Sequence, residues 1–506
     1  MKHYVCGIDI GSSALKITLL AADGSTLGPF KREIITKFPK PSYAQQDPSQ
    51  WYALLKECLQ DAFETGLVDG AHIAAVAPDA ATHTTVLLDE NYSPVRDAIM
   101  WNDQRSAALA AACPIRDRVF QLTNHAPGAM WSLFQCMWVK ENEPDVWKRT
   151  RYLLFPKDYL RFQLTGVYCT DHIDAEGTEL YDVHTKSWSA ELCAQLGFPV
   201  EQLPPIKKAT DLAGILTAAA AEDLGLAAGI PVYVGTTDTV MEITAAGAVS
   251  LGQATVKLAT SGRICVVTNR AFPHEQLVNY SHVVEGLWYP GTGTRSCATS
   301  LRWYKDHFAK AEAAEARAKG KSVYRILDEK AAGVPAGCEG LFFHPYLLGE
   351  FTPYSDENLR ASFIGASMKH TEAHFIRAIL EGAAYSLRDC MGVVEKLGMS
   401  ITAEHLLLIG GGSVSSLWGQ ILADVLGRTI AVPAVSDSSF GSAMLAGVAC
   451  GMFPDFYDAV SRCCRVTGVI EPNGENKACY DSLFPVYQQL VQVLAPVYKQ
   501  LAEILR

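Results

Sequence analysis

The sequence predicts an α/β protein built from two related domains that face one another. At 506 residues and 55.0 kDa, the chain is too long for one ordinary core, and two domains of roughly 200–250 residues are expected. Residues 3–20 have the pattern of a strand, a small polar turn with glycine and a second strand, and residues 254–268 repeat it. This internal pseudo-repeat predicts an N-terminal domain at residues 1–248 and a C-terminal domain at residues 249–506.

The composition indicates a globular enzyme that does not bind nucleic acid. Hydrophobic residues make up 49% of the chain and charged residues 19%, and the net charge is -11 without a basic block. Fourteen cysteines without a Cys-x-x-Cys pair are typical of reduced thiols. The sequence shows no signal peptide and no apolar run of about 18 residues. We therefore expect a cytoplasmic protein without membrane segments.

The first strand pair carries a candidate phosphate and metal site. Asp9 ends an apolar run, and Gly11, Ser12 and Ser13 form the turn. Glycine lets the backbone approach a phosphate closely, and serine hydroxyls and turn N–H groups donate to phosphate oxygens. Phosphate would repel Asp9 unless a cation lay between them, and Mg²⁺ meets that need. A plain β-hairpin with a polar turn explains the same residues equally well.

A predicted helix and two predicted strands follow. Residues 49–65 place apolar side chains on one face at helical spacing, and residues 72–77 and 84–88 are apolar strand candidates. His83 stands between the two strands. It could donate to a substrate, but a lone histidine is more often a strand-edge residue, which favours the simpler interpretation.

The segment around Trp101 combines groups that suit a polyol. Trp101, Asn102, Asp103 and Arg105 place an aromatic ring, an amide, a carboxylate and a guanidinium within five residues. An apolar wall with fixed polar partners is typical of a small-molecule site. The alternative is a capped helix start, with Asn102 or Asp103 as the N-cap.

A third polar segment follows a predicted helix. Residues 155–166 indicate a helix that ends at a glycine C-cap. Asp171 and Asp174 lie three residues apart and could form a catalytic pair of carboxylates. Carboxylates in such a loop more often accept from local backbone N–H groups, and we favour that role.

Asp238 stands near the middle of the chain at a strand-to-helix turn. Residues 230–234 form an apolar strand candidate, a Gly-Thr-Thr turn follows, and a helix rich in small residues begins after it. An acid in that position projects from the carboxyl end of a strand, where α/β proteins bind ligands. An isolated Asp there would more often be a helix N-cap. The phosphate-binding turns on both sides of this point favour the functional interpretation.

The second half contains two further glycine turns. Thr260, Ser261 and Gly262 form the turn of the repeated hairpin, and Gly410, Gly411 and Gly412 lie between a buried strand and a helix start. Glycine-rich strand-to-helix turns let a nucleotide lie against bare backbone. The remaining elements are helices, which we expect at residues 309–336, 371–397, 439–449 and from about residue 480.

In this order, the segments resemble the FGGY carbohydrate kinases of the actin and hexokinase superfamily, and they look most like xylulose kinases. The resemblance runs from residue 7 to about residue 451 and rests on the order and spacing of many short matches. It implies two ribonuclease H-like α/β domains with a catalytic cleft between them. The matching segments are residues 46–48, 100–105, 156–161, 164–166, 174–178, 260–262 and 349–353.

The resemblance implies an ATP-dependent, Mg²⁺-dependent kinase that acts on a small sugar or polyol, with xylulose as the first candidate. It also suggests a homodimer. Asp238 matches the catalytic base, and Asp9 matches the metal side of the first phosphate turn. The other matching positions are Gly11, Ser12 and Ser13 (first phosphate turn), Thr260, Ser261 and Gly262 (second phosphate turn), Gly410, Gly411 and Gly412 (adenosine turn), Arg302 (nucleotide), and Thr82, His83, Trp101, Asn102 and Asp103 (sugar).

Four positions depart from the family pattern. Thr239 stands where Asn or Gln is usual, Thr82 where Met is common, Phe351 where Arg is usual, and Gln135 where a Lys is expected. These departures lie near the sugar-binding residues or the residues that support them. They leave the prediction of phosphoryl transfer unchanged but weaken the case for D-xylulose as the substrate. Other ketoses, pentitols and sugar acids are the alternatives, together with a nucleotide-gated ATPase on the same superfamily fold.

Overall fold

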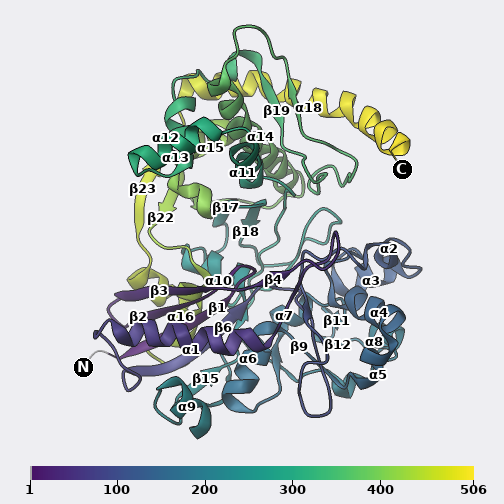
Figure 1. Ribbon diagram of the computed structural model, residues 1–506, viewed down its shortest axis with the longest axis vertical. Coiled ribbons are helices and arrows are strands. Elements are labelled where there is room, and N and C mark those ends of the chain that lie inside the picture. The colour runs from purple at the N-terminus through teal and green to yellow at the C-terminus, as the bar shows by residue number, and fades with distance from the viewer. Residues whose placement is uncertain (1–2, 506) are drawn as a thin grey trace.

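The computed structural model describes residues 3–505 and shows two α/β halves stacked along the long axis (Figure 1). One half contains a seven-stranded sheet and the other a five-stranded sheet. In each sheet a hairpin contributes one strand that also pairs in parallel with a later strand. The repeat that the two hairpins predict is therefore present in the fold.

The N-terminal sheet is arranged around β1 (Tyr4–Ile10), whose seven residues are all buried. β1 pairs antiparallel with β2 (Ala14–Ala21) and parallel with β6 (Ile73–Ala80). A strand covered on both faces has a nearly continuous apolar sequence, as this one has. The strand order is β14 (Leu212–Ile215), β15 (Pro231–Tyr233), β6, β1, β2 and β3 (Thr26–Glu33), and β16 (Thr236–Thr237) also pairs with β6.

Shorter strands and helices complete the first half. Its remaining strands are β3 (Thr26–Glu33), β4 (Thr36–Lys37), β5 (Gln45–Gln46), β7 (Val86–Leu88), β8 (Ala98–Ile99), β9 (Tyr152–Leu154), β10 (Thr170–Asp171), β11 (Tyr181–Asp182), β12 (Ser187–Trp188), β13 (Ile206–Lys207), β14 (Leu212–Ile215) and β15 (Pro231–Tyr233). Its helices are α1 (Ser49–Glu64), α2 (Ala107–Ala111), α3 (Arg116–Thr123), α4 (Ser132–Asn142), α5 (Pro144–Arg149), α6 (Pro156–Thr165), α7 (His172–Glu176), α8 (Ala190–Leu196), η1 (Val200–Gln202), α9 (Ala218–Leu224) and α10 (Asp238–Ala245).

The C-terminal sheet repeats the hairpin arrangement. β17 (Ala254–Leu258) pairs antiparallel with β18 (Gly262–Val266) and parallel with β21 (Leu406–Ile409). The sheet continues with β22 (Ile430–Pro433) and β23 (Val466–Ile470). The other elements of the second half of the sequence are α11 (Ala298–His307), α12 (Lys310–Lys319), α13 (Val323–Ala331), η2 (Cys338–Gly340), β19 (Phe342–His344), β20 (Ser362–Ile364), α14 (Glu372–Lys396), η3 (Gly411–Val414), α15 (Ser416–Leu426), α16 (Ser438–Ala449), α17 (Phe456–Cys463) and α18 (Gly474–Ile504).

Helix α16 belongs to the second half of the sequence but lies against the N-terminal sheet (Figure 1). Glycines make the close approach possible. A Cβ on Gly7 of β1 would lie 2.0 Å from the carbonyl oxygen of Ser439, and one on Gly441 of α16 would lie 2.1 Å from that of Met241. The small residues of α16 therefore bring the C-terminal half of the chain onto the central strand of the first sheet.

The longest predicted helices are confirmed within about one residue for α1 and α14. α6 ends at Gly166, which adopts the left-handed conformation expected of a C-cap glycine. Two boundaries differ. The triple glycine forms a short 3₁₀ turn before α15 begins at Ser416, and the last helix, α18, begins at Gly474 rather than near residue 480. Among the described residues, none of the helices is long and apolar enough to cross a membrane.

Candidate active site

Three carboxylates lie at the carboxyl ends of neighbouring parallel strands. Asp9 of β1 is directly opposite Asp79 of β6, and Asp79 is opposite Thr236 of β16, which leads into Asp238. This edge of an α/β sheet is where such proteins bind ligands. Both Asp9 and Asp79 are buried. The β-sheet register therefore brings two of the predicted site residues, Asp9 and Asp238, to one edge, together with an acid that the sequence analysis missed.

Asp238 is the first residue of α10, and it is not the N-cap. Thr237 occupies the cap position and makes no side-chain cap hydrogen bond. Asp238 is half-buried, and its Oδ1 accepts a hydrogen bond from the Thr239 hydroxyl at 3.2 Å. The N-cap interpretation of Asp238 is therefore wrong, and the carboxylate is available for another role.

The environment of Asp238 raises its pKa to about 6. Burial is the largest cause, because a carboxylate loses its hydration there. The negative charges of Glu242 and Asp9 raise the pKa further, and the positive charge of Lys257 lowers it. A carboxyl group with this pKa is a carboxylate at neutral pH and is basic enough to accept a proton.

Asp9 pairs with Lys16 and has one oxygen free of protein partners. The Lys16 ammonium lies 3.1 Å from Oδ2 of Asp9 and 2.8 Å from Oδ2 of Asp437, the N-cap of α16. Oδ1 of Asp9 is buried and has no hydrogen-bond partner within residues 3–505, and burial raises the pKa of this carboxyl group. An unpaired oxygen of a hard carboxylate fits Mg²⁺. Lys16 and Asp437 were not predicted, because they reach the site from a strand face and from a helix over 400 residues away along the chain.

Asp79 lies between Asp9 and Asp238 and is fully buried. Its Oδ2 accepts a hydrogen bond of 2.6 Å from the Ser442 hydroxyl of α16, and its Oδ1 has no hydrogen-bond partner among the described residues. Burial and the charges of Asp9 and Asp238 raise its pKa well above the usual range. A signal for it exists in the sequence, since Asp79 ends the apolar run of β6 as Asp9 ends that of β1.

The first phosphate turn lies beside Trp101. Ser12 and Ser13 are exposed, and the Trp101 indole N–H donates to the Ser12 hydroxyl at 2.8 Å. The Ser12 carbonyl accepts from the Gln46 amide at 2.9 Å. The structure thus brings Trp101 next to the turn of residues 11–13, and Gln46 stabilises this turn through the Ser12 carbonyl.

Asn102 and Asp103 have different surroundings. Asn102 is exposed, whereas Asp103 is fully buried. Both oxygens of Asp103 are occupied: Oδ1 accepts from Nε of Arg105 and Oδ2 from Nη2, each at 2.8 Å, and Oδ2 also accepts from the Ala44 N–H at 2.6 Å. Asp103 therefore stabilises the conformation of residues 101–105. We expected this carboxylate near the sugar, but both of its oxygens already accept hydrogen bonds from the protein.

His83 adopts a left-handed backbone conformation with a φ of 63°, which is uncommon for a residue other than glycine. Its Nδ1 lies 2.9 Å from the Gly177 carbonyl, so it is the donor, and Nε2 accepts from the Tyr280 hydroxyl at 3.0 Å. Burial lowers its pKa to about 3, and the ring is neutral. The Gln135 amide donates to the His83 carbonyl at 3.2 Å, while Thr82 is half-buried beside it.

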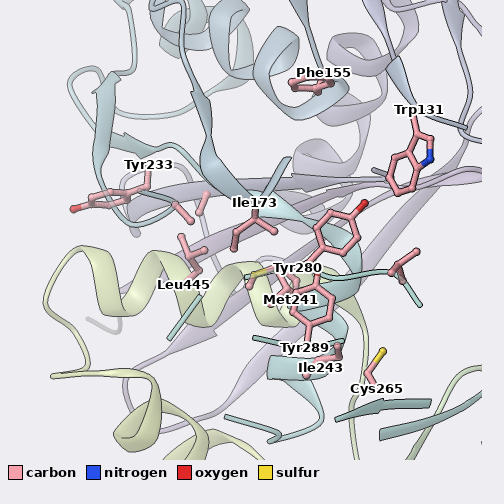
Figure 2. Close-up of a cluster of buried hydrophobic side chains, with 14 of the residues drawn as sticks. Trp131, Phe155, Ile173, Tyr233, Met241, Ile243, Cys265, Tyr280, Tyr289 and Leu445 are labelled. Atoms are coloured by element: carbon pink, nitrogen blue, oxygen red, sulfur yellow. The ribbon is translucent and has the colours of Figure 1, made fainter. Parts of the chain in front are cut away.

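Aromatic rings from both halves of the chain surround His83. Its ring makes an edge contact with Trp131, with 4.6 Å between centroids, and Tyr280 stacks on Tyr289 at 5.7 Å. Figure 2 shows the two tyrosines together with Met241 of α10 and Cys265 of β18. His83 thus belongs to a wall of rings that joins the two halves.

The second phosphate turn and the triple glycine lie against each other. A Cβ on Gly410, which has a φ of 87°, would lie 2.6 Å from the carbonyl oxygen of Leu258, at the end of β17. Thr260 is exposed and Ser261 is half-buried, while the Gly262 N–H donates to Thr294 at 2.8 Å. A Cβ on Gly411 would meet no atom within 4 Å in the part of the chain that the structure describes, whereas Gly412 is buried. Arg302, on the nearby helix α11, is exposed.

Two cations of the C-terminal sheet face α10. Lys257 of β17 pairs with Glu242, and Arg263 of β18 donates to the Thr239 hydroxyl at 3.4 Å. Lys257 and Arg263 are cross-strand partners, so their side chains leave the same face of the sheet. Neither residue was predicted from the sequence, because a single charged residue in a strand is common and does not by itself indicate a site.

Asp171 and Asp174 lie in a buried ion cluster. The Lys157 ammonium lies 3.0 Å from Oδ1 of Asp171 and 3.2 Å from Oδ2 of Asp174. Oδ2 of Asp171 accepts from the Ile173 N–H at 3.0 Å and from the Thr236 hydroxyl at 2.8 Å. The local role that we favoured for these acids is confirmed for Asp171, which also holds the strand that leads to Asp238.

Comparison with known proteins identifies the family. Models of the N-terminal and C-terminal domains of the FGGY family of carbohydrate kinases match residues 4–245 and 233–450. A xylulose kinase of Lactococcus lactis is 32% identical over 96% of both chains, and a gluconokinase of Bacillus subtilis is 26% identical over 100% of this chain and 99% of its own. The solved xylulose kinase of Rhodospirillum rubrum superimposes with a TM-score of 0.85 at 28% identity, covering 98% of this chain and all of that one. This chain belongs to the FGGY family of carbohydrate kinases.

Proposed function

We propose that the protein transfers the γ-phosphoryl group of ATP to a hydroxyl group of a ketopentose, with D-xylulose as the first acceptor to test. The position of Asp238 is the observation that carries this proposal. Its carboxylate, with a pKa near 6, follows the strand β16 that pairs beside Asp79 and Asp9. Curated xylulose kinases that are 28–32% identical over nearly the whole chain support the choice of acceptor.

In this proposal Asp238 orients the sugar hydroxyl and accepts its proton as the new bond to phosphorus forms. Little covalent chemistry falls to the protein in phosphoryl transfer, so positioning and charge stabilisation dominate. The hydroxyl group becomes acidic only late in the reaction, and a carboxylate with a moderately raised pKa is then a sufficient base. The ion pair of Lys257 and Glu242 lies beside it, and both charges act on its pKa.

The nucleotide and its metal ion would be held by groups that the two turns leave free. Gly11–Ser13 and Thr260–Gly262 would bind phosphate oxygens, Gly410–Gly412 would face the adenosine, and Arg302 is exposed near that side. Oδ1 of Asp9, buried and unpaired, fits a divalent cation. Bound Mg²⁺ supplies charge neutralisation on the phosphate oxygens. A homodimer remains a prediction, which sedimentation would test.

A sugar acid is the second candidate acceptor. The gluconokinase of Bacillus subtilis matches the full length of this chain. Arg263 adds a cation near Asp238, and a cation there suits an acceptor that carries a carboxylate.

A coupled assay of ADP release, run with and without a panel of ketoses, pentitols and aldonates, tests the proposal. Sugar-dependent ADP release with formation of a phosphosugar is the expected result. ATP hydrolysis that is indifferent to every sugar, with no phosphosugar formed, would favour a nucleotide-gated ATPase instead.

A further inference from the structure

Arg263 of β18 lies beside Cys265, a member of the buried cluster that contains Tyr280 and Tyr289. Arg263 and Cys265 alternate along β18 and therefore leave the same face of the strand. Cys265 packs in the cluster that contains Tyr280 and Tyr289 (Figure 2). A Cβ on Gly291 would lie 2.8 Å from Sγ of Cys265 and 3.7 Å from Cδ of Arg263. The Arg263 side chain thus starts beside the two tyrosines.

The charge of Arg263 acts on the proposed base and on the aromatic residues around His83. Its charge lowers the pKa of His83, and it interacts electrostatically with Tyr289, Tyr280 and Asp238. Its one hydrogen bond among the described residues is the long contact of 3.4 Å to the Thr239 hydroxyl. The guanidinium therefore approaches α10 at Thr239, the residue that follows the proposed base.

The neighbouring cation, Lys257, has an ion-pair partner, whereas Arg263 has none among the described residues. Lys257 pairs with Glu242. Arg263 has no carboxylate within 4.0 Å among the residues that the structure describes. A guanidinium has five donors in a planar fork, so most of its donors remain available. Burying half of a guanidinium that has no ion-pair partner costs free energy, and a bound anion would offset that cost.

From this geometry we propose that Arg263 binds a carboxylate group of the acceptor and that the preferred acceptor is a sugar acid of the aldonate class. A carboxylate matches the guanidinium fork with two parallel hydrogen bonds, whereas a sugar hydroxyl accepts one. A phosphate dianion would need a second free cation, and Lys257 is occupied by Glu242. This inference rests on the proposed kinase function and selects between its two candidate acceptors.

The test compares charged and neutral acceptors in the full-length protein. The probes are D-xylonate and D-gluconate as carboxylates, D-xylulose and xylitol as neutral acceptors, and D-fructose 6-phosphate as a phosphate. We expect kcat/KM to be at least about tenfold higher for the better aldonate than for any neutral probe. In Arg263→Gln, the ratio of aldonate to neutral kcat/KM is expected to fall by about 100-fold, mainly through KM, because a bidentate charge-assisted contact is lost.

Two further variants keep the result interpretable. Arg263→Lys keeps the charge but loses the fork, and we expect it to recover only part of the aldonate preference. Arg325→Gln removes an exposed arginine of α13 that pairs with Glu329, and its acceptor ratio should equal that of the wild type. Retained ATP affinity and an unfolding midpoint no lower than that of the wild type show that Arg263→Gln folds.

The outcomes separate this inference from the proposed function. If the enzyme phosphorylates neutral sugars best and Arg263→Gln lowers all acceptors equally, the kinase function stands and the role of Arg263 is overturned. A preference for D-fructose 6-phosphate overturns the carboxylate assignment. If no sugar is phosphorylated, the proposed function fails, and this inference fails with it.

Discussion

Asp238 owes its proposed chemistry to charged neighbours that come from both halves of the chain. Glu242 lies one turn further along α10 and raises its pKa, while Lys257 of β17 lowers it. Asp9 adds negative charge from β1. The balance of these charges with burial places the pKa near 6, and each neighbour can be altered separately.

The pH dependence of the reaction should report this pKa. The carboxylate is the active form, so kcat/KM for the sugar should fall about tenfold per pH unit below pH 6. In Glu242→Gln the acid limb should move to lower pH, because a negative charge that raises the pKa of Asp238 is removed. An acid limb that stays in place in this variant would contradict the assignment of the titrating group.

Asp79 should make the protein less stable as the pH rises. Its folded pKa is raised, so the folded protein keeps a proton that the unfolded chain has lost, and stability falls as the pH rises above the ordinary range of an aspartate. Asp79→Asn keeps an acceptor for Ser442 and removes this ionisation. We expect Asp79→Asn to unfold at a higher temperature than the wild type at pH 7, and Asp79→Ala to unfold at a lower one, because Ser442 loses its partner. A lower midpoint for Asp79→Asn at pH 7 than for the wild type would show that Asp79 is ionised.

At the scale of elements, the sequence pattern predicts the helix α16 but not the elements against which it packs. Its small residues predict close packing, but its packing partners, β1 and α10, are separated from it by about 200 residues or more. Hydrophobic periodicity describes one element at a time, and it does not indicate which sheet a helix covers.

Gly441→Ala tests the packing of α16 directly. The new methyl group would lie 2.1 Å from the Met241 carbonyl oxygen, so we expect a loss of about 3 kcal/mol in the free energy of unfolding. Gly392→Ala, inside α14 with no atom within 4 Å of the new Cβ, is the matched control. It should stabilise the protein by about 0.5–1 kcal/mol. Equal effects of the two substitutions in denaturant unfolding would contradict the packing described for α16.

The triple glycine offers a matched pair for the nucleotide site. Gly411→Ala meets no atom within 4 Å, so the protein should fold normally while KM for ATP rises about tenfold if the adenosine lies on this turn. Gly410→Ala forces a side chain at a φ of 87° against Leu258 and should lower stability instead. An unchanged KM for ATP in Gly411→Ala would remove this turn from the nucleotide site.

At the scale of the whole molecule, the two hairpins, the Asp9 and Asp238 positions and the glycine turns could be predicted from the sequence. Each of them depends on a local pattern of apolar runs, small turns and a lone acid. Lys16, Asp437 and Arg263 could not, because their roles arise only when strands and helices far apart in the chain meet at one sheet edge. Asp103 was expected at the sugar, but its oxygens accept from Arg105 and from the Ala44 N–H, and the sequence pattern does not show the contact from Ala44, which is 59 residues away.

The proposed kinase activity depends most directly on Asp238, which accepts the proton of the sugar hydroxyl. Asp238→Asn keeps the shape of the side chain and removes its ability to accept a proton. We expect sugar-dependent ADP release to fall at least about 10³-fold, with the affinity for ATP within threefold of the wild type and an unfolding midpoint that does not drop. Turnover within tenfold of the wild type in Asp238→Asn would contradict the account.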